Sequence, residues 1–210
     1  MIVAIDGPAG AGKSTVARRL AERLGFRYLD TGAMYRALTW LALTEGLPLG
    51  DGEPLGELAR ANPVTFDEHG RVSIAATDVT ASIRQARIDQ NVPVVARHPA
   101  VREVMRERQR ALAAEGDVVI EGRDIGTVVA PDAEVKIYLI ADTEIRARRR
   151  QAERPDIGGD ALVTDLRSRD QSDAPRMRPA DDAEQIDTTN LQVEGVVDHI
   201  EQLVRERQPA

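Results

Sequence analysis

Short apolar runs alternate with longer amphipathic stretches along most of this chain. The runs at residues 2–5, 26–29, 117–121, 135–140 and 183–187 predict five short strands. Strands separated by helical stretches usually form parallel sheets, because a crossover helix returns the chain to the same edge. The pattern therefore predicts an α/β fold of three layers around a five-stranded parallel sheet.

Helical periodicity accounts for most of the sequence between these strands. Residues 13–24 place Val16, Leu20 and Leu24 on one apolar stripe, and Gly25 follows at the position where helices commonly end. We expect this stripe to face the sheet. Further helices are expected at residues 33–45, 87–96, 100–114, 161–173 and 193–207, and one more begins after Asp142 and Thr143.

Two segments interrupt this alternation. Residues 47–62 are rich in glycine and proline, which predicts a linker with little regular structure. Residues 64–67 and 71–75 flank Gly70 and predict a β-hairpin. We therefore expect residues 60–85 to form a small antiparallel β insert.

A second break precedes a segment rich in arginine. Asp-Ile-Gly-Gly at residues 156–159 predicts a mobile joint, and Arg176 and Arg178 follow the helix predicted at 161–173. Arginines held between flexible joints are what a phosphate-covering helical lid requires. We expect one domain over residues 1–210, with its core at about 1–59, 86–150 and 180–210, the insert at about 60–85 and the lid at about 151–179.

Composition and charge narrow the class of protein. Hydrophobic residues make up 42% of the chain, which supports a full core, and the net charge of −7 argues against a general nucleic-acid binder. Without cysteine the chain can form neither disulfides nor thiolate metal sites. The sequence opens on a core strand, which leaves no room for a signal peptide, and no apolar run reaches the ~20 residues of a membrane span. We expect a cytoplasmic monomer that binds neither nucleic acid nor membrane.

The segment between the first strand and the first helix carries the clearest chemical signal. Gly-Pro-Ala-Gly-Ala-Gly-Lys-Ser at residues 7–14 matches G-x-x-x-x-G-K-[ST], the pattern of a P-loop. Glycines let consecutive backbone N–H groups turn toward phosphate oxygens, and the helix N-terminus adds its positive dipole end. Lys13 can reach the β- and γ-phosphates, and the Ser14 hydroxyl can take one position on Mg²⁺. The predicted nucleoside-triphosphate site consists of Gly7, Pro8, Ala9, Gly10, Ala11, Gly12, Lys13, Ser14 and Thr15.

Charged residues follow two other strands at the same predicted edge of the sheet. Ligands of open parallel sheets bind beyond the carboxyl ends of the strands, where Thr31, Arg36, Arg123 and Asp124 lie. An N-cap at Asp30 and a structural Arg123–Asp124 salt bridge are the simpler interpretations, although the cap does not explain Arg36. Several arginines around one phosphate loop indicate phosphoryl transfer between two bound molecules, because their permanent charge and bidentate geometry suit phosphate.

Four arginines lie close together on the helix after the fourth strand, at Arg146, Arg148, Arg149 and Arg150. Such a run is typical of a solvated helix face or of a nucleic-acid patch. The acidic total and the absence of interleaved aromatic residues disfavour nucleic acid.

Four motifs together resemble bacterial cytidylate kinases, which are nucleoside monophosphate kinases of the P-loop type. They are Gly-Pro-Ala-Gly-Ala-Gly-Lys-Ser-Thr at 7–15, Asp-Thr-Gly-Ala-Met-Tyr-Arg at 30–36, Gly-Arg-Asp-Ile-Gly-Thr-Val-Val at 122–129 and Asp-Thr-Thr-Asn-Leu at 187–191. Many families share the first motif, whereas the second and third together are specific, and the resemblance covers essentially the whole chain. It implies transfer of the γ-phosphate of ATP to CMP or dCMP with Mg²⁺, in a fold with core, monophosphate-binding and lid parts.

The same resemblance implies roles for particular residues. Arg36 and Arg123 would grip the α-phosphate of CMP, and Arg102 and Asp124 would read the cytosine edge, where a carboxylate can accept from the C4 amino group. The implied catalytic residues are Lys13, Arg123 and Arg176. The implied substrate-binding residues are Thr31, Arg36, Arg102, Arg123, Asp124, Arg169, Asp173 and Arg176, of which the last three belong to the lid base.

Position 93 departs from the family pattern. The family usually has a serine near this position that helps to hold cytosine, whereas this chain has Pro93. Either that hydrogen bond is lost or the helix aligns differently, and acceptance of UMP as well as CMP stays an open alternative.

Three other classes of protein share some of these features. A P-loop kinase for another acceptor, such as a different nucleoside monophosphate or shikimate, would share the first motif but lack the combination at 122–124 and 169–176. A regulatory GTPase needs Asn-Lys-x-Asp, and neither Lys13 nor Lys136 stands in such a sequence. A non-catalytic ATP-binding module would not need so many converging arginines.

Overall fold

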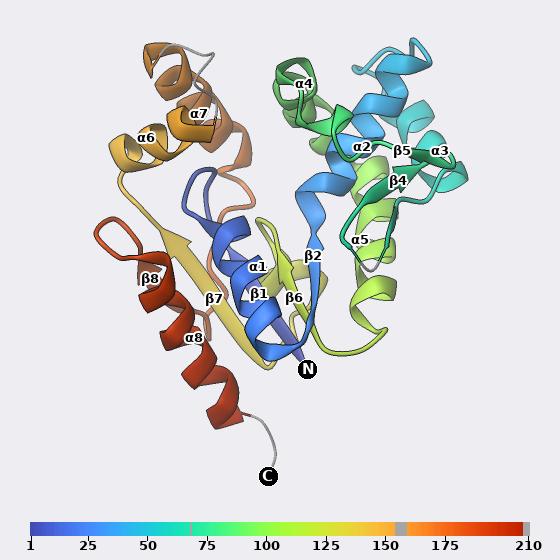
Figure 1. The fold of residues 1–210 in the computed structure, drawn as a ribbon. Helices are drawn as coiled ribbons and strands as arrows, with labels where there is room; N and C mark the ends of the chain where they lie inside the picture. Colours follow the sequence, from blue (N-terminus) through green and yellow to red (C-terminus); the bar gives the residue numbers. More distant parts are fainter. Residues whose placement is uncertain (68, 154–158, 208–210) are drawn as a thin grey trace. The chain divides into compact units, whose positions relative to one another are not determined.

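The structure, a computed structural model, describes residues 1–67, 69–153 and 159–207 (Figure 1). Its contacts divide the chain into two compact units, unit 1 (Met1–Leu29 and Gly116–Ala210) and unit 2 (Asp30–Glu115), and each is described by itself. The joint predicted at 156–159 falls mostly outside the described residues. The functional division into core, insert and lid stays a prediction.

Unit 1 is built on a five-stranded sheet with the strand order β2-β6-β1-β7-β8. The strands are β1 (Ile2–Asp6), β2 (Arg27–Asp30), β6 (Val118–Glu121), β7 (Val135–Ile140) and β8 (Glu184–Asp187). The central strand β1 pairs in parallel with β6 and β7, and β7 pairs in parallel with β8. The predicted α/β class is confirmed, and each predicted strand lies within one residue of its observed bounds.

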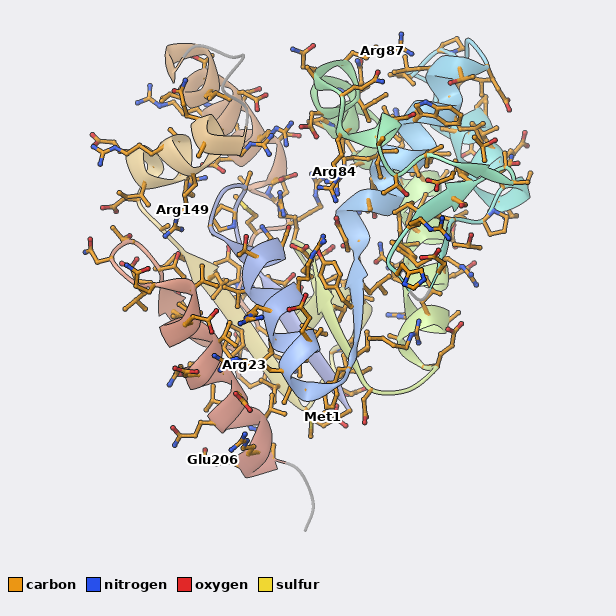
Figure 2. All side chains as sticks on the ribbon, viewed as in Figure 1. Met1, Arg23, Arg84, Arg87, Arg149 and Glu206 are labelled. Atoms are coloured by element: carbon orange, nitrogen blue, oxygen red, sulfur yellow. The ribbon has the colours of Figure 1, made fainter. Side chains whose placement is uncertain are left out.

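One face of this sheet is covered by α1 (Lys13–Leu24) and α8 (Val193–Arg207), which lie side by side on it (Figure 1). Alternate strand residues point to this face, and Val3 and Ile5 of β1 pack there against both helices. On the outer side of the two helices, Arg23 of α1 forms ion pairs with carboxylates of α8, among them Glu201 at 3.1 Å (Figure 2). The bounds of both helices agree with the prediction.

Three further elements complete the described part of unit 1. A π-helical turn, η2 (Ile125–Val129), follows β6, and α6 (Thr143–Glu153) follows β7. Helix α7 (Gly159–Asp173) packs on α6. Leu166 of α7 is fully buried against Ala147 of α6 and Ala9, so both helices are joined to the loop after β1.

Unit 2 combines helices with a small antiparallel sheet. Its helices are α2 (Thr31–Thr44), α3 (Gly52–Ala61), α4 (Ala86–Ala96) and α5 (Pro99–Ala113), with a 3-10 turn, η1 (Ser82–Arg84), before α4. The sheet has the order β3 (Thr65–Phe66), β4 (Val72–Ile74) and β5 (Thr77–Asp78). The predicted hairpin is confirmed as β3–β4, and β5 adds a third strand that the sequence did not suggest.

The prediction of an irregular linker over residues 47–62 is wrong, because α3 occupies Gly52–Ala61. Pro54 lies in the first turn of this helix, where a missing N–H removes no intrahelical hydrogen bond. Gly56 allows close packing on α5, since a Cβ there would lie 2.9 Å from the Cβ of Ala100. Leu55 and Ala59 are buried on the same face. The helical structure of this segment therefore follows from the spacing of its apolar residues, and its glycine and proline content does not prevent it.

Candidate active site

Residues 7–12 form a phosphate loop between β1 and α1. Gly7, Gly10 and Gly12 adopt φ values of 143°, 78° and 92°, which residues with a side chain rarely adopt. At Gly7 space also excludes a side chain, because a Cβ would lie 2.1 Å from the carbonyl oxygen of Leu139 on β7. The loop leads into the N-terminus of α1, whose first N–H groups have no helical partner and form a site for anions.

Side chains from α6 and from the loop after β8 hold the carbonyl groups of the phosphate loop. Arg146 Nη1 donates to the carbonyl of Ala9 at 3.0 Å, and Thr188 Oγ1 donates to that of Ala11 at 3.0 Å. Arg149 donates in turn to the Thr188 hydroxyl at 3.0 Å. These hydrogen bonds hold the loop in its conformation, and the N–H groups of loops of this kind are the groups that can bind phosphate. The interpretation of the arginine run as a solvated face is therefore wrong for Arg146, which is buried.

Lys13 is buried, and its Nζ donates to the carbonyl of Pro8 at 2.8 Å. Burial lowers the pKa of Lys13 to about 7, and the nearby Arg123 guanidinium acts in the same direction. The carboxylates that oppose this shift are Glu121, Asp6 and Asp173. Lys13 thus sits among groups of both signs, and an arriving anion would favour its charged form.

Asp6, at the end of β1, connects the phosphate loop to the loop after β6. Its two carboxylate oxygens accept from the backbone N–H groups of Ile125 at 2.9 Å and Gly126 at 2.8 Å. Burial raises the pKa of Asp6, and the two N–H groups work against that rise. This contact fixes the segment that carries Arg123 and Asp124. Sequence reasoning missed Asp6, whose only signal was an acidic residue at the end of a buried strand.

The structure brings three of the predicted residues together in unit 1. Arg123 Nε donates to Asp173 Oδ2 at 2.9 Å, and Arg176 Nη2 donates to Asp173 Oδ1 at 2.8 Å. Although burial raises the pKa of Asp173, the two guanidinium groups hold it below its ordinary value. Asp173 therefore joins an arginine after β6 to an arginine after α7, so that two cations contact one carboxylate. We call Arg123, Asp173 and Arg176 the arginine–carboxylate cluster.

Two further predicted residues of unit 1 have different surroundings. Asp124 and Arg176 line one cavity of about 550 Å³. Arg169 forms an ion pair with Asp165, one turn earlier on α7, at 3.1 Å. Asp124 is thus linked to the arginine–carboxylate cluster through a shared cavity, whereas the ion pair of Arg169 stays within its own helix.

In unit 2, Asp30 both caps α2 and binds the predicted arginine. Its Oδ1 accepts from the backbone N–H of Ala33 at 2.9 Å, and its Oδ2 accepts from Arg36 Nη2 at 2.7 Å. Arg84 lies 3.8 Å from the same carboxylate. Burial alone would raise the pKa of Asp30, but the two arginines hold it below its ordinary value. The interpretation of Asp30 as an N-cap is confirmed, and the same carboxylate orients Arg36.

The other predicted residues of unit 2 lie on its helices. Thr31 is buried in the first turn of α2, and Arg102 is half-buried near the N-terminus of α5. Pro93 lies inside α4. Their roles toward a nucleotide stay predictions, as do those of the other site residues.

A second cavity of unit 1, of about 490 Å³, opens beside the phosphate loop. It is lined by Gly10 and Gly12, by Arg149 of α6 (Figure 2) and by residues 188–193. Arg149 Nη2 donates to the Thr188 carbonyl at 2.6 Å, which fixes one wall, and Leu191 contributes exposed apolar surface. The volume lies within the range of small-molecule sites.

Ser14 offers an oxygen of the kind that Mg²⁺ takes. It is exposed in the first turn of α1. Among the described residues, no group of three or more His, Cys, Asp or Glu could hold a metal ion. Mg²⁺ commonly keeps water and phosphate ligands and needs few from the protein, so one hydroxyl beside the phosphate loop fits it.

A parallel sheet whose central strand ends in this loop, with arginines held beside it, defines a P-loop kinase. A solved shikimate kinase from Acinetobacter baumannii shares the fold, with 18% identity and a TM-score of 0.51 over 100% of this chain and 95% of that chain. A family model described as cytidylate kinase matches residues 3–206. The chain belongs to the cytidylate kinase family.

Two curated relatives illustrate the likeness, and both are named cytidylate kinase. The protein from Shouchella clausii is 46% identical over 97% of this chain and 96% of its own length. The protein from Pelotomaculum thermopropionicum is 50% identical over 93% of this chain and 92% of its own length. The resemblance inferred from the four motifs is thus confirmed over nearly the whole chain.

Proposed function

We propose that this protein transfers the γ-phosphate of ATP to CMP or dCMP, giving ADP and CDP or dCDP. Family membership supports the reaction. The observation that carries the mechanism is the cluster of Lys13, Arg123, Asp173 and Arg176 in the unit that holds the phosphate loop. Three cations in one cluster suit a reaction in which negative charge must be neutralised from several sides.

Phosphoryl transfer to a nucleotide needs positioning more than proton transfer. The transition state spreads charge over three equatorial oxygens, and a phosphate acceptor is already nucleophilic, so no strong base is required. In the proposed mechanism Lys13 and the loop N–H groups hold the β- and γ-phosphates. Arg123 and Arg176 supply bidentate donors to the acceptor phosphate and the group in transit.

Asp173 would prepare these two arginines before substrate arrives. Because it holds both guanidinium groups at hydrogen-bond distance, their side chains are ordered without a bound anion. An incoming phosphate would then take donors from arginines that are already in place. We further propose that Asp173 and Arg169 contact the ribose of the acceptor, as the family resemblance implies.

The donor nucleoside would occupy the cavity of about 490 Å³ beside the phosphate loop. The planar Arg149 guanidinium and the apolar surface of Leu191 suit a base ring. Mg²⁺ bound with ATP at the Ser14 hydroxyl would neutralise phosphate charge. The remaining loop residues would bind the triphosphate through their backbone.

The acceptor base would be read by Asp124, whose carboxylate can accept from the C4 amino group of cytosine but not from the O4 of uracil. Thr31, Arg36 and Arg102 are the other residues that we propose for binding the acceptor. Because Pro93 stands where the family usually has serine, turnover of UMP would indicate a relaxed preference for the acceptor base.

Among the described helices none is long and apolar enough to cross a bilayer. The proposed partners are ATP and the acceptor nucleotide, and a cytoplasmic monomer is the form we expect.

The test is a coupled assay of the purified protein with ATP and Mg²⁺ across CMP, dCMP, UMP, AMP and GMP. We expect the highest kcat/KM values for CMP and dCMP. A Lys13→Met variant serves as the control for contaminating kinases, because it lacks the charge that binds the transferred phosphate. Preferential turnover of AMP or GMP would overturn the proposed acceptor.

A further inference from the structure

Arg146 of α6 forms as many hydrogen bonds as its side chain can donate. Nε donates to Ala141 O at 3.1 Å, Nη1 donates to Ala9 O and to Asp170 Oδ1 at 3.0 Å each, and Nη2 donates to Thr143 Oγ1 at 3.1 Å and Asp170 Oδ2 at 2.6 Å. A guanidinium group has five N–H donors, so all of them are used within the protein. Only 5% of this residue is exposed. Arg146 is therefore built to bind protein groups, whereas a phosphate ligand needs free donors.

The groups that Arg146 joins belong to two functional segments. Ala9 is part of the phosphate loop, and Asp170 lies on α7, three residues before Asp173. An apolar contact follows the same path, because Ala9, Ala147 and Leu166 form one buried cluster. The phosphate loop, α6 and α7 are thus joined by both polar and apolar contacts.

We propose that Arg146 and Asp170 are positioning residues that couple the phosphate loop to α7. A triphosphate on the loop N–H groups fixes the peptide units whose carbonyls face outward, and the Ala9 carbonyl is bonded to Arg146. The two parallel hydrogen bonds to Asp170 fix the angle between guanidinium and carboxylate. A loop held in one conformation would therefore also restrict the motion of α7. Because α7 ends at Asp173, the coupling would extend to the arginine–carboxylate cluster, which Asp173 holds together before any nucleotide binds. Linkage makes the effect reciprocal, so ordering of α7 would strengthen nucleotide binding.

Asp170→Asn weakens the contact between Arg146 and α7 and leaves the contact between Arg146 and the phosphate loop unchanged. It keeps the size of the side chain, but it removes the charge and sets an amide NH₂ against the guanidinium N–H groups. The Arg146–Ala9 bond stays. We therefore expect α7 to lose its coupling to the loop while the loop itself keeps its geometry.

The experiment is hydrogen–deuterium exchange with a non-hydrolysable ATP analogue and no acceptor. In the unmodified protein we expect the analogue to slow exchange in residues 159–173 by about fivefold or more, the lower range of coupling between sites. In Asp170→Asn this slowing should be lost, and because linkage is reciprocal the Kd of the analogue should rise by a similar factor, about fivefold. The matched control is Glu144→Gln, which removes one carboxylate from the exposed Glu144–Arg148 pair on α6 and should behave as the unmodified protein.

A second variant, Arg146→Lys, guards against failure of the first. Lysine has three donors on a single nitrogen and cannot form the bidentate pair and the Ala9 bond together. It should lose the slowing of α7 and also weaken analogue binding by about tenfold, as misplacement of binding groups by small distances does. A purely structural pair would instead lower the melting temperature and leave the slowing of α7 by the analogue intact in both folded variants. That result, or equal slowing in Asp170→Asn and the unmodified protein, would overturn the coupling.

The inference rests on the proposed function only for the identity of the donor as ATP. Because the exchange experiment contains no acceptor, failure of CMP phosphorylation would leave its result standing. Conversely, normal turnover of CMP with no slowing of α7 by the analogue would overturn the coupling and leave the proposed reaction intact.

Discussion

The state of Lys13 leads to a quantitative prediction about nucleotide binding. In the nucleotide-free protein its pKa lies at about 7, against an ordinary value of 10.5, because burial and the nearby Arg123 disfavour the charged form. A bound triphosphate brings several negative charges to Nζ and should raise this pKa again. Above pH 7, binding of ATP should therefore take up a proton.

The size of the effect follows from the pKa. With a value of about 7, the protonated fraction of Lys13 falls from about one quarter at pH 7.5 to about one hundredth at pH 9. If the protonated form is the one that binds, the affinity for ATP falls by about 25-fold over this interval, and binding at pH 9 takes up about one proton. The phosphate groups do not confound the result, since their second pKa lies near 6.

The measurement is isothermal titration calorimetry of ATP at pH 7.5 and 9 with EDTA present, in two buffers of different ionisation enthalpy. The difference between buffers gives the number of protons taken up. The control is Lys13→Met, whose affinity should be lower and should not change with pH. An affinity in the unmodified protein that changes less than threefold, with no proton uptake, would show that Lys13 stays charged and would refute the reasoning.

The same pKa shift makes the stability of the nucleotide-free protein depend on pH. Between about pH 7 and 10.5 the unfolded chain keeps the proton that folded Lys13 has lost, so the unfolded state binds more protons. The free energy of unfolding of the nucleotide-free protein should therefore rise with pH in this window, by at most about 1.4 kcal/mol per pH unit from this group. Below pH 7 the full cost of burying the charge is present. Urea unfolding of the unmodified protein relative to Lys13→Met isolates this contribution.

Three further predictions concern single residues. Arg123→Ala should remove most turnover while the calorimetric Kd for ATP stays near its original value; near-normal kcat would remove Arg123 from the mechanism. Asp124→Ala should narrow the ratio of kcat/KM values for CMP and UMP by about tenfold, since one base-edge contact discriminates by 1–3 kcal/mol, and an unchanged ratio would contradict this role. Gly7→Ala should lower the free energy of unfolding, measured in urea, by about 2 kcal/mol or more. The reason is that its Cβ would lie 2.1 Å from Leu139 O, at a φ of 143°. A loss below about 0.5 kcal/mol would mean that the loop can shift to make room for the side chain.

The sequence predicted the elements of this protein well where one physical signal acts alone. Apolar runs located all five strands of unit 1, and apolar spacing located α1 and α8. Helix α3 was missed because Pro54 and Gly56 are breakers in general, and only the structure reveals one in a first turn and the other against Ala100. Local composition could not distinguish these cases.

The site was predictable to the extent that its chemistry lies within short motifs. The phosphate loop and the arginines near it follow from residue type and spacing. The groups that fix these residues were not predictable, because they come from distant parts of the chain. Asp6 binds the N–H groups of Ile125 and Gly126, 119 and 120 positions away, and Arg146 binds Ala9 across 137 positions. A basic helix gives no sign, from its sequence alone, of which arginine is buried.

The contacts that complete the phosphate loop also set an order in which the protein can become competent during synthesis. The glycine motif leaves the ribosome first, yet Arg146, Arg149 and Thr188, which hold its carbonyls, are made much later. A nascent chain shorter than 188 residues would carry the whole motif and lack the Thr188 contact, and one that ends before Arg146 would lack all three. Nucleotide binding should therefore begin only after Thr188 has been synthesised, when the phosphate loop can meet the side chains from positions 146 to 188.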